Sequence, residues 1–503
     1  MTSIIDRIAP GRDQAPAILA PDRPPLTHGG LRALIADTAA RLNAAGIGRG
    51  DRVAIVLPNG PEMATAFLAV AATATTAPLN PAYREDEFDF YLSDIGAKAL
   101  IVLSGEDGPA VTVAGRRGIA ILRLTPDADG PAGQFTLDGH KSGTVVRPEL
   151  AEDGDTALLL HTSGTTSRPK LVPLSHANLA ASAAHIGQTL ALTPDDRCLN
   201  IMPLFHIHGL IAAVLASLAA GGSTYCTPGF NALRFFAWLS EAQPTWYTAV
   251  PTMHQAILAR AARNPEAVAA AKLRFIRSSS ASLPPQVMAE LEALFGCPVV
   301  ESYGMTEAAH QMASNPLPPS TRKPGSVGIA AGPEVGIMAE NGAMLGPDLV
   351  GEIVIRGPNV TAGYEANPDA NASAFAHGWF HTGDQGTIDA DGYVRVTGRL
   401  KEIINRGGEK ISPREVDEVI MDCPAVAQVV TFAMPHDKLG EEVAAAVVLR
   451  EGETATERDI RSFCATRLAD FKVPRKIVIL DEIPKGATGK LQRIGLAQKL
   501  GLA

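Results

Sequence analysis

The first two-thirds of the chain alternate short apolar runs with amphipathic segments, and this alternation strongly limits the folds available to it. Runs typical of buried strands are "VAIVLPNG" (53–60), which ends in turn residues, "ALIVL" (99–103), "TALLL" (156–160), "LRFIRSS" (273–279) and "PVVESYG" (298–304). Between such runs, residues 31–46 carry leucines at helical spacing and stop at Gly46. Strands that alternate with helices predict an α/β fold whose mostly parallel sheets are covered on both faces. In such sheets, ligands bind beyond the carboxyl ends of the strands.

The pattern changes after about residue 323. "GSVGIA", "EVGIMA", "GEIVIRG" and "GYVRVTG" are short strands separated by glycine, which predicts a small β-rich subdomain. Near residue 400 a smaller α+β unit begins. Its first helix should start at a capping box formed by Ser412 and Glu415, with Pro413 in the first helical position. We therefore expect a large N-terminal domain over residues 1–399 and a small mobile C-terminal domain over 400–503.

Bulk composition excludes several classes of protein. A length of 503 residues is too great for one core, and a net charge of −9 is opposite in sign to the usual nucleic-acid footprint. The longest apolar run, residues 209–220, is too short to span a bilayer and predicts a buried helix. The N-terminus does not resemble a secretory signal, and the five cysteines occur singly. We expect a cytoplasmic protein, monomer or homodimer, with no nucleic-acid or membrane partner.

Residues 161–170, "HTSGTTSRPK", combine hydroxyl side chains, one glycine and a lysine directly after a predicted strand. Small donors and close backbone approach favour phosphate binding. The segment is not the usual phosphate loop, because it lacks the second glycine and the Gly-Lys-Thr ending. It predicts a different class of nucleotide chemistry.

Seven segments, in this order, resemble the acyl-adenylate-forming family, which includes acyl-CoA synthetases, luciferases and adenylation domains. They are "HTSGTTSRPK", "PLFHIHG", "SASLPP", "ESYGMTEAAH", "GWFHTGDQG", "GRLKEIINRGGEK" and "PKGATGKLQR". The resemblance implies ATP, Mg²⁺ and coenzyme A as cofactors. It also implies two steps: a carboxylate attacks the α-phosphate of ATP and releases pyrophosphate, and the CoA thiolate then displaces AMP. Catalysis of this kind depends mainly on positioning and charge neutralisation.

The resemblance also implies roles at the nucleotide. The loop over the β- and γ-phosphates would comprise Thr162, Ser163, Gly164, Thr165, Thr166 and Lys170. Ser302, Tyr303 and Gly304 would line the nucleotide, with the Tyr303 ring stacked on adenine. Thr306 would touch the α-phosphate, and Glu307 would hold Mg²⁺, a hard cation that suits a carboxylate. Asp384 and Arg399 would bind the ribose hydroxyls.

Residues of the C-terminal unit match the family's mobile parts. Lys490 matches the adenylation lysine, which places a point charge between the attacking carboxylate and the α-phosphate. Lys401 occupies the hinge position, where the small domain is expected to rotate between the two steps. Gly407 and Gly408 would let pantetheine pass close to the backbone. Some relatives carry Lys where this chain has Asn405, so Asn405 is given no catalytic role.

The acyl group must be inferred from the pocket. His206, Ser280 and His310 are the polar candidates there, and a second carboxylate needs such donors because a buried unpaired charge is costly. Several longer segments resemble plant and fungal oxalate–CoA ligases, a group in which the residues matching these three bind oxalate. The resemblance implies that the product is oxalyl-CoA. Malonate or another short diacid remains the alternative substrate, followed by longer or aromatic acids.

Other classes of function predict different products or residues. A phosphoryl-transferring NTPase would release ADP and phosphate rather than AMP and pyrophosphate. A non-catalytic nucleotide-binding protein should have lost Glu307 or Lys490, and both are present. An adenylation domain that loads a carrier protein is harder to exclude, although no carrier-like segment follows, so free CoA is the simpler acceptor.

Overall fold

The computed structural model describes residues 3–8, 12–139, 145–162, 169–485 and 491–503. One sheet of the large lobe runs in the order β7 (Phe135–Gly139), β6 (Ala120–Pro126), β5 (Ala99–Leu103), β3 (Arg52–Val56), β4 (Thr75–Pro78), β8 (Thr156–His161) and β9 (Leu171–Ser175). Its inner strands are parallel, and β7 and β9 pair antiparallel at the two edges. The predicted strands within the runs 53–60, 99–103 and 156–160 are confirmed, and the first strand ends at Val56, before the turn residues of its run.

A second sheet has the order β16 (Ile329–Ala330), β15 (His310–Ser314), β14 (Val299–Met305), β13 (Phe275–Ser279), β12 (Trp246–Ala249), β10 (Arg197–Asn200), β11 (Ser223–Cys226), β1 (Pro16–Leu19) and β2 (Leu26–Thr27). The six strands from β14 to β1 are parallel, so their carboxyl ends share one edge of the sheet. This arrangement confirms the α/β class.

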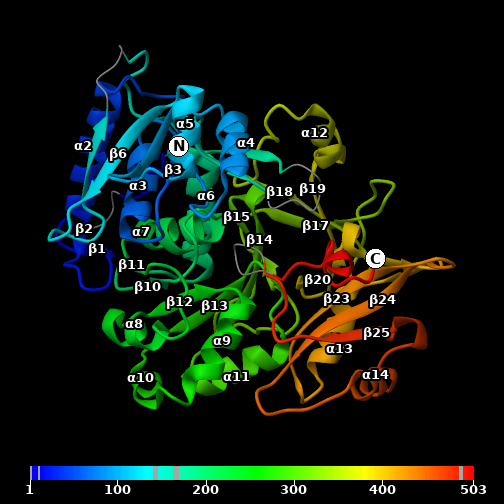
Figure 1. Cartoon of the computed structure of the whole chain (residues 1–503). Helices are drawn as coiled ribbons and strands as arrows, with labels where there is room; N and C mark the ends of the chain where they lie inside the picture. Colours follow the sequence, from blue (N-terminus) through cyan, green and yellow to red (C-terminus); the bar gives the residue numbers. More distant parts are fainter. Residues whose placement is uncertain (1–2, 9–11, 140–144, 163–168, 486–490) are drawn as a thin grey trace.

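Helices cover both sheets and complete the core between them (Figure 1). They are α2 (His28–Ala44), α3 (Pro61–Ala71), α4 (Glu85–Ile95), α5 (Pro109–Arg117), α6 (His176–Thr189), α8 (Phe235–Ala242), α9 (Pro251–Ala261), α10 (Pro265–Ala270) and α11 (Pro285–Phe295). The predicted buried helix at 209–220 is also present. Its first part, η1 (His208–Leu215), is a π-helix that continues into α7 (Ala216–Ala219), and every residue of η1 is buried. π-Helices often occur at functional sites.

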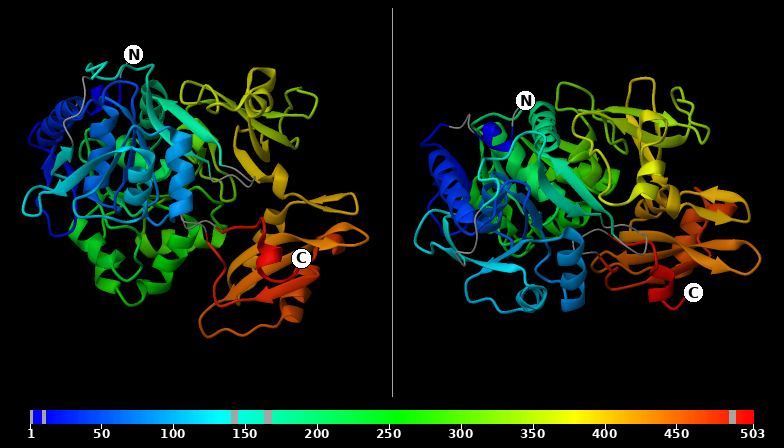
Figure 2. Two further views of the ribbon diagram at one scale, coloured as in Figure 1. Left: turned by 45° about the horizontal axis from the view of Figure 1, so that its top comes forward. Right: turned by 90° about the horizontal axis from the view of Figure 1, so that it is seen from above.

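The β-rich subdomain is an antiparallel sheet of β17 (Glu334–Met338), β18 (Gly351–Arg356), β19 (Phe380–Ile388) and β20 (Val394–Arg399). After η4 (Leu400–Glu402) the small lobe begins, with β21 (Ile404–Arg406), β22 (Glu409–Ile411), α13 (Pro413–Met421), β23 (Val426–His436), β24 (Gly440–Leu449), α14 (Glu457–Ala465) and β25 (Lys476–Ile479). Figure 2 shows this lobe beside the large one. Among the residues described, no helix has both the length and the hydropathy to cross a membrane.

The start of α13 differs in part from the predicted capping box. The Ser412 hydroxyl accepts a hydrogen bond from the Glu415 backbone N–H, and Pro413 occupies the first turn as expected. The Glu415 carboxylate instead accepts from Lys472 at 2.6 Å. A charged partner from elsewhere in the lobe has therefore replaced the second hydrogen bond of the box.

The two lobes touch through side chains of α9 and α11. Gln255 Nε2 donates to the Ala427 carbonyl at 3.0 Å, and Gln286 donates to Asp422. Glu290 and Arg450 form an ion pair at 3.6 Å, with both side chains partly exposed. Further polar contacts join β20 of the large lobe to α13, including a hydrogen bond from Arg414 Nη1 to the Val396 carbonyl at 2.5 Å and an ion pair between Arg395 and Glu418 at 3.0 Å.

Candidate active site

Several of the predicted site residues lie at one edge of the nine-stranded sheet. Thr248 lies on β12 near its carboxyl end, Ser280 directly follows β13, and Thr306 directly follows β14. The segment after β10 leads into His206 and His208. Because these four strands are parallel neighbours, their carboxyl ends lie side by side at one edge of the sheet, where ligands are expected in such folds.

Glu307 lies in the single turn η2 (Thr306–Ala308) and is buried, with 6% of its surface exposed. Its Oε1 accepts a hydrogen bond from the Tyr364 hydroxyl at 2.9 Å, and its backbone carbonyl accepts from Thr361 at 2.8 Å. Burial raises the pKa of this carboxyl, and the Tyr364 hydrogen bond works against that rise. An exposed acid in a plain loop would show none of this.

Cations surround the Glu307 carboxylate. Lys170 Nζ lies 4.3 Å from the centre of the Tyr364 ring, so the lysine and Glu307 share one aromatic partner. Burial lowers the pKa of Lys170, Glu307 raises it, and the nearby charge of Lys401 lowers it again. The charge of Arg399 also reaches Glu307. We name Glu307, Tyr364, Lys170, Asp384 and Arg399 the nucleotide end of the site.

Asp384 and Arg399 are direct partners across β19 and β20. Arg399 Nε lies 3.1 Å from Asp384 Oδ1, and the Tyr303 hydroxyl donates to Asp384 Oδ2 at 2.5 Å. Asp384 is buried, and its attraction raises the pKa of Arg399. The structure therefore brings together three residues that the sequence assigned to the nucleoside.

The remaining residues predicted at the nucleotide shape the backbone around it. The Ser302 hydroxyl pairs with that of Ser314 at 2.9 Å, inside the sheet. A Cβ on Gly304 would lie 1.9 Å from the carbonyl oxygen of His310, so only glycine allows β14 and β15 to approach this closely. Thr306 begins the turn that presents Glu307.

His208 connects the candidates at the opposite end of the site. Its Nδ1 lies 3.0 Å from Ser280 Oγ, and its Nε2 lies 2.6 Å from Thr248 Oγ1. His206, the residue predicted from the sequence, is half-buried, and its Nδ1 accepts the His208 backbone N–H at 3.3 Å. His208 thus links Ser280 to Thr248 of β12.

His310 is the first residue of β15 and is 1% exposed, which excludes a surface histidine in a loop. Its ring centre lies 5.0 Å from that of His208. The Nη2 of Arg277, a fully buried residue of β13, lies 3.4 Å from His310 Nδ1. We name His208, Ser280, Thr248, His310 and Arg277 the acyl end of the site.

Backbone conformation marks two of these residues. Ser280 has φ +72° and His310 has φ +108°, values that side-chain-bearing residues adopt at a cost. Strained conformations of this kind persist where the surrounding structure enforces them, and they cluster at functional sites.

Several predicted residues lie outside the described part of the chain. These are Ser163, Gly164, Thr165, Thr166 and Lys490. The ends of the first loop are described: the Thr162 N–H donates to the Lys170 carbonyl at 2.9 Å, and the Lys170 N–H donates to Thr162 Oγ1 at 3.2 Å. These bonds continue the β8–β9 pairing by one more residue pair.

In the small lobe, Gly407 and Gly408 form the two-residue turn between β21 and β22. Their φ values of +59° and +98° suit a tight hairpin turn that other residues resist. The Asn405 side chain accepts the Gly408 N–H at 3.2 Å, so it supports this turn. Lys401 is exposed in η4, between the last strand of one sheet and the first of the next.

Sequence reasoning missed His208, Arg277 and Tyr364. A signal existed for Arg277, a charged residue inside the buried-strand run "LRFIRSS". His208 sits two residues after the predicted His206, and only the start of η1 distinguishes their surroundings. Tyr364 lies 57 residues from Glu307, and nothing local links the two.

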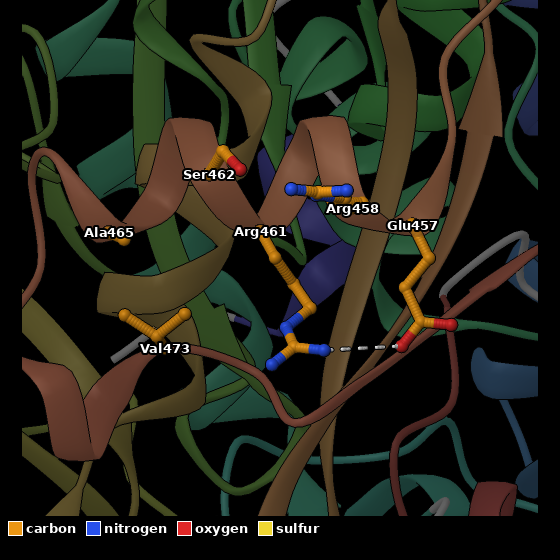
Figure 3. A pocket seen from close by; sticks show the side chains of 6 residues that line it. All are labelled: Glu457, Arg458, Arg461, Ser462, Ala465 and Val473. Atoms are coloured by element: carbon orange, nitrogen blue, oxygen red, sulfur yellow. Dashed lines mark ion pairs between the residues drawn. The ribbon is translucent and has the colours of Figure 1, made fainter.

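A hollow of about 620 Å³ lies against α14 in the small lobe, lined by Glu457, Arg458, Arg461, Ser462, Ala465 and Val473 (Figure 3). Arg461 pairs with Glu457 at 4.0 Å within the helix. Figure 1 places α14 at the margin of the small lobe, away from β14 and β15. None of the residues predicted for the site lines this hollow.

The described residues contain no group of three or more His, Cys, Asp or Glu side chains arranged to hold a metal ion. A single buried carboxylate such as Glu307 still fits Mg²⁺, because this ion keeps water ligands and takes other oxygens from substrate phosphates. The raised pKa of Glu307 is consistent with a carboxyl that gains from a nearby cation.

Comparison with known proteins identifies a family for both lobes. Residues 5–365 match the family described as "AMP-binding enzyme", and residues 415–490 match "AMP-binding enzyme C-terminal domain". An oxalate–CoA ligase of Arabidopsis thaliana is 50% identical over 94% of this chain and 93% of its own. One of Saccharomyces cerevisiae is 42% identical over 90% and 87%. The solved structure of ATP-bound MatB from Rhodopseudomonas palustris has a TM-score of 0.88 and 31% identity, covering 99% of this chain and 98% of that one.

Proposed function

The chain belongs to the AMP-binding enzyme family, and from that premise we propose that it is an AMP-forming oxalate–CoA ligase. The observation that favours oxalate as the acid is the polar character of the acyl end. Two histidines, a serine and a buried arginine gather there, where an enzyme for fatty acids needs an apolar tunnel. The identity with oxalate–CoA ligases over nearly the whole chain supports the same acid.

The first step forms a bond between a carboxylate oxygen of the acid and the α-phosphorus of ATP, and the bond to pyrophosphate breaks. We place Asp384 and Arg399 at the ribose, Tyr303 at adenine, and Ser302, Gly304 and Thr306 along the α-phosphate. Lys170 and the loop that begins at Thr162 would neutralise the outer phosphates. Mg²⁺, held through Glu307, would offset charge on the phosphate oxygens.

Lys490 is the residue we assign to the charge between the acid and the α-phosphate. In the second step the CoA thiolate attacks the acyl carbon, and the bond to AMP breaks. We propose that a rotation about Lys401 exchanges Lys490 for the β21–β22 turn, so that Gly407 and Gly408 border the pantetheine. The contacts that α9 and α11 make with the small lobe are polar, which favours such a motion.

We place the enzyme in the cytoplasm, as a monomer or homodimer that acts on small molecules without nucleic-acid or membrane partners. The five cysteines are all free and buried, which suits a reducing compartment. The net charge of −9 opposes binding to nucleic acid.

An assay of pyrophosphate release tests the proposal with oxalate, malonate, acetate, octanoate and cinnamate, each with and without CoA. We expect oxalate to give AMP and pyrophosphate, and CoA to convert the adenylate to a thioester. ADP as product would indicate phosphoryl transfer instead. Turnover of octanoate or cinnamate without turnover of oxalate would refute oxalate as the substrate, while the assignment to the AMP-binding enzyme family would stand.

A further inference from the structure

Arg277 is a cation in the middle of the nine-stranded sheet, and its guanidinium has few hydrogen-bond partners among the described residues. It lies on β13, opposite Thr248 of β12 and Val300 of β14, and none of its surface is exposed. No Asp or Glu among the described residues forms an ion pair with it, and within that part of the chain its Nε and Nη1 have no hydrogen-bond partner. Burial lowers its pKa to about 9, so the group remains charged at neutral pH.

Within the described part of the chain, the guanidinium forms hydrogen bonds only through its Nη2, to two neighbours on β15. One is Gln311 Oε1 at 3.3 Å, and the other is His310 Nδ1 at 3.4 Å. The Gln311 amide is held by its Nε2, which donates to Thr189 Oγ1 and to the Ala331 carbonyl, both at 3.1 Å. Since a carbonyl only accepts, this fixes the amide with its oxygen toward Arg277.

The contact with His310 also fixes a tautomer. A guanidinium has donors and no acceptor, so the hydrogen bond requires His310 Nδ1 to be the acceptor. The imidazole is then neutral and carries its proton on Nε2. A second positive charge on the ring would face the buried Arg277 and be disfavoured.

We propose that Arg277 sets the preference of this enzyme for an acid with two negative charges: it holds His310 as an Nε2–H donor and supplies the uncompensated positive charge behind it. The inference rests on the proposed function and identifies the residue that makes the acyl end select a dianion. Arg277 is a positioning residue here, since it acts through His310 and through its field. An unpaired buried cation lowers stability, and a gain in substrate binding is a reason to keep it.

The test compares oxalate with oxamate, in which a neutral amide replaces one carboxylate. Binding of each acid is measured by calorimetry with the enzyme saturated by an ATP analogue that cannot be cleaved at the α-phosphate. For Arg277→Met we expect a loss of oxalate affinity of roughly 30- to 100-fold, the factor that attraction across about 6–8 Å gives at an effective dielectric near 20. Oxamate and the nucleotide analogue should each change by less than about threefold.

Thermal unfolding separates this role from a structural one. Arg277→Met replaces a buried cation by an apolar side chain of similar length, so Tm should stay the same or rise. Arg197→Met is the matched control on the same sheet, at the amino end of β10, where Arg197 donates to the Ala242 carbonyl at 2.7 Å. It should lower Tm and leave the ratio of oxalate to oxamate affinity unchanged.

Equal losses for oxalate and oxamate, or a fall in Tm together with weaker nucleotide binding, would overturn the proposal. If Arg277→Met does not fold, Arg277→Lys decides. It keeps the charge and loses the directed hydrogen bond, so a 3- to 10-fold drop in the oxalate preference supports the role and an unchanged preference refutes it. A wild type that binds oxalate and oxamate equally well refutes it too. Failure of the wild type to turn over oxalate would instead refute the proposed function.

Discussion

The two ends of the site differ in how their charges are balanced. At the nucleotide end, Asp384 is matched by Arg399, and the charges of Lys170 and Arg399 reach Glu307. At the acyl end, Arg277 has no ion pair with any described carboxylate. Paired charges at the nucleotide end favour no particular acid, whereas the unpaired positive charge at the acyl end favours binding of an anion. The difference suggests that changes at the nucleotide end should affect every acid equally, and changes at the acyl end only some.

The largest effect is expected from Glu307→Gln. Loss of the carboxylate should slow pyrophosphate release by roughly 100- to 1,000-fold with every acid tested, because charge stabilisation at the phosphates depends on it. A loss confined to oxalate would break the division between the two ends.

The same variant makes a prediction about stability. Burial raises the pKa of Glu307 above its unfolded value, so its contribution to stability is present at low pH and is lost as the pH rises through the folded pKa. Glu307→Gln should therefore have an equal or higher Tm than the wild type at pH 7, with the difference shrinking toward pH 4. Thermal scans across this range measure it, and a large drop in Tm at pH 7 would contradict it.

His310→Ala is expected to have the next largest effect on activity. Removing the imidazole donor should lower kcat/KM for oxalate by roughly 50- to 100-fold, because a carboxylate of the substrate would lose a hydrogen-bond partner in a buried site. The Kd of a non-cleavable ATP analogue should change by less than about twofold. An equal loss of kcat/KM for oxalate and of affinity for the ATP analogue would show that His310 stabilises the fold rather than binding the acid.

Tyr364→Phe probes the nucleotide end more gently. A hydrogen bond to a charged group is worth about 1.5 kcal/mol, so the rate should fall roughly 10-fold with all acids alike. The bond also lowers the pKa of Glu307, so its removal should raise that pKa and move the acid limb of the pH–rate profile to higher pH. An acid limb that stays in place would mean that Glu307 does not govern it.

Glu290→Gln should have the smallest effect. Its ion pair with Arg450 joins the lobes at the surface, and exposed pairs contribute at most about 1 kcal/mol. We expect less than about a threefold change in thioester formation and no change in the ratio between acids. A shift in acid preference would show that the lobe contact reaches the acyl end.

The nucleotide end could largely be predicted from the sequence, because its residues sit in short segments whose local order is informative. Asp384 and Arg399 were assigned from such segments, and the structure pairs them across β19 and β20. At the acyl end, His206, Ser280 and His310 were predicted from the sequence, whereas the contacts of His208 and Arg277 were missed.

The sequence by itself determined the α/β class and the strand runs, because these follow from local periodicity and from the parallel pairing that periodicity implies. Only the tertiary structure decided which side chains meet there. Arg277 on β13 reaches His310 on β15 because only one strand, β14, separates these two strands in the sheet. This strand order is set by packing across the whole lobe. The surroundings of a buried charge depend on residues distant in sequence, so no local pattern could have shown that Arg277 lacks a carboxylate.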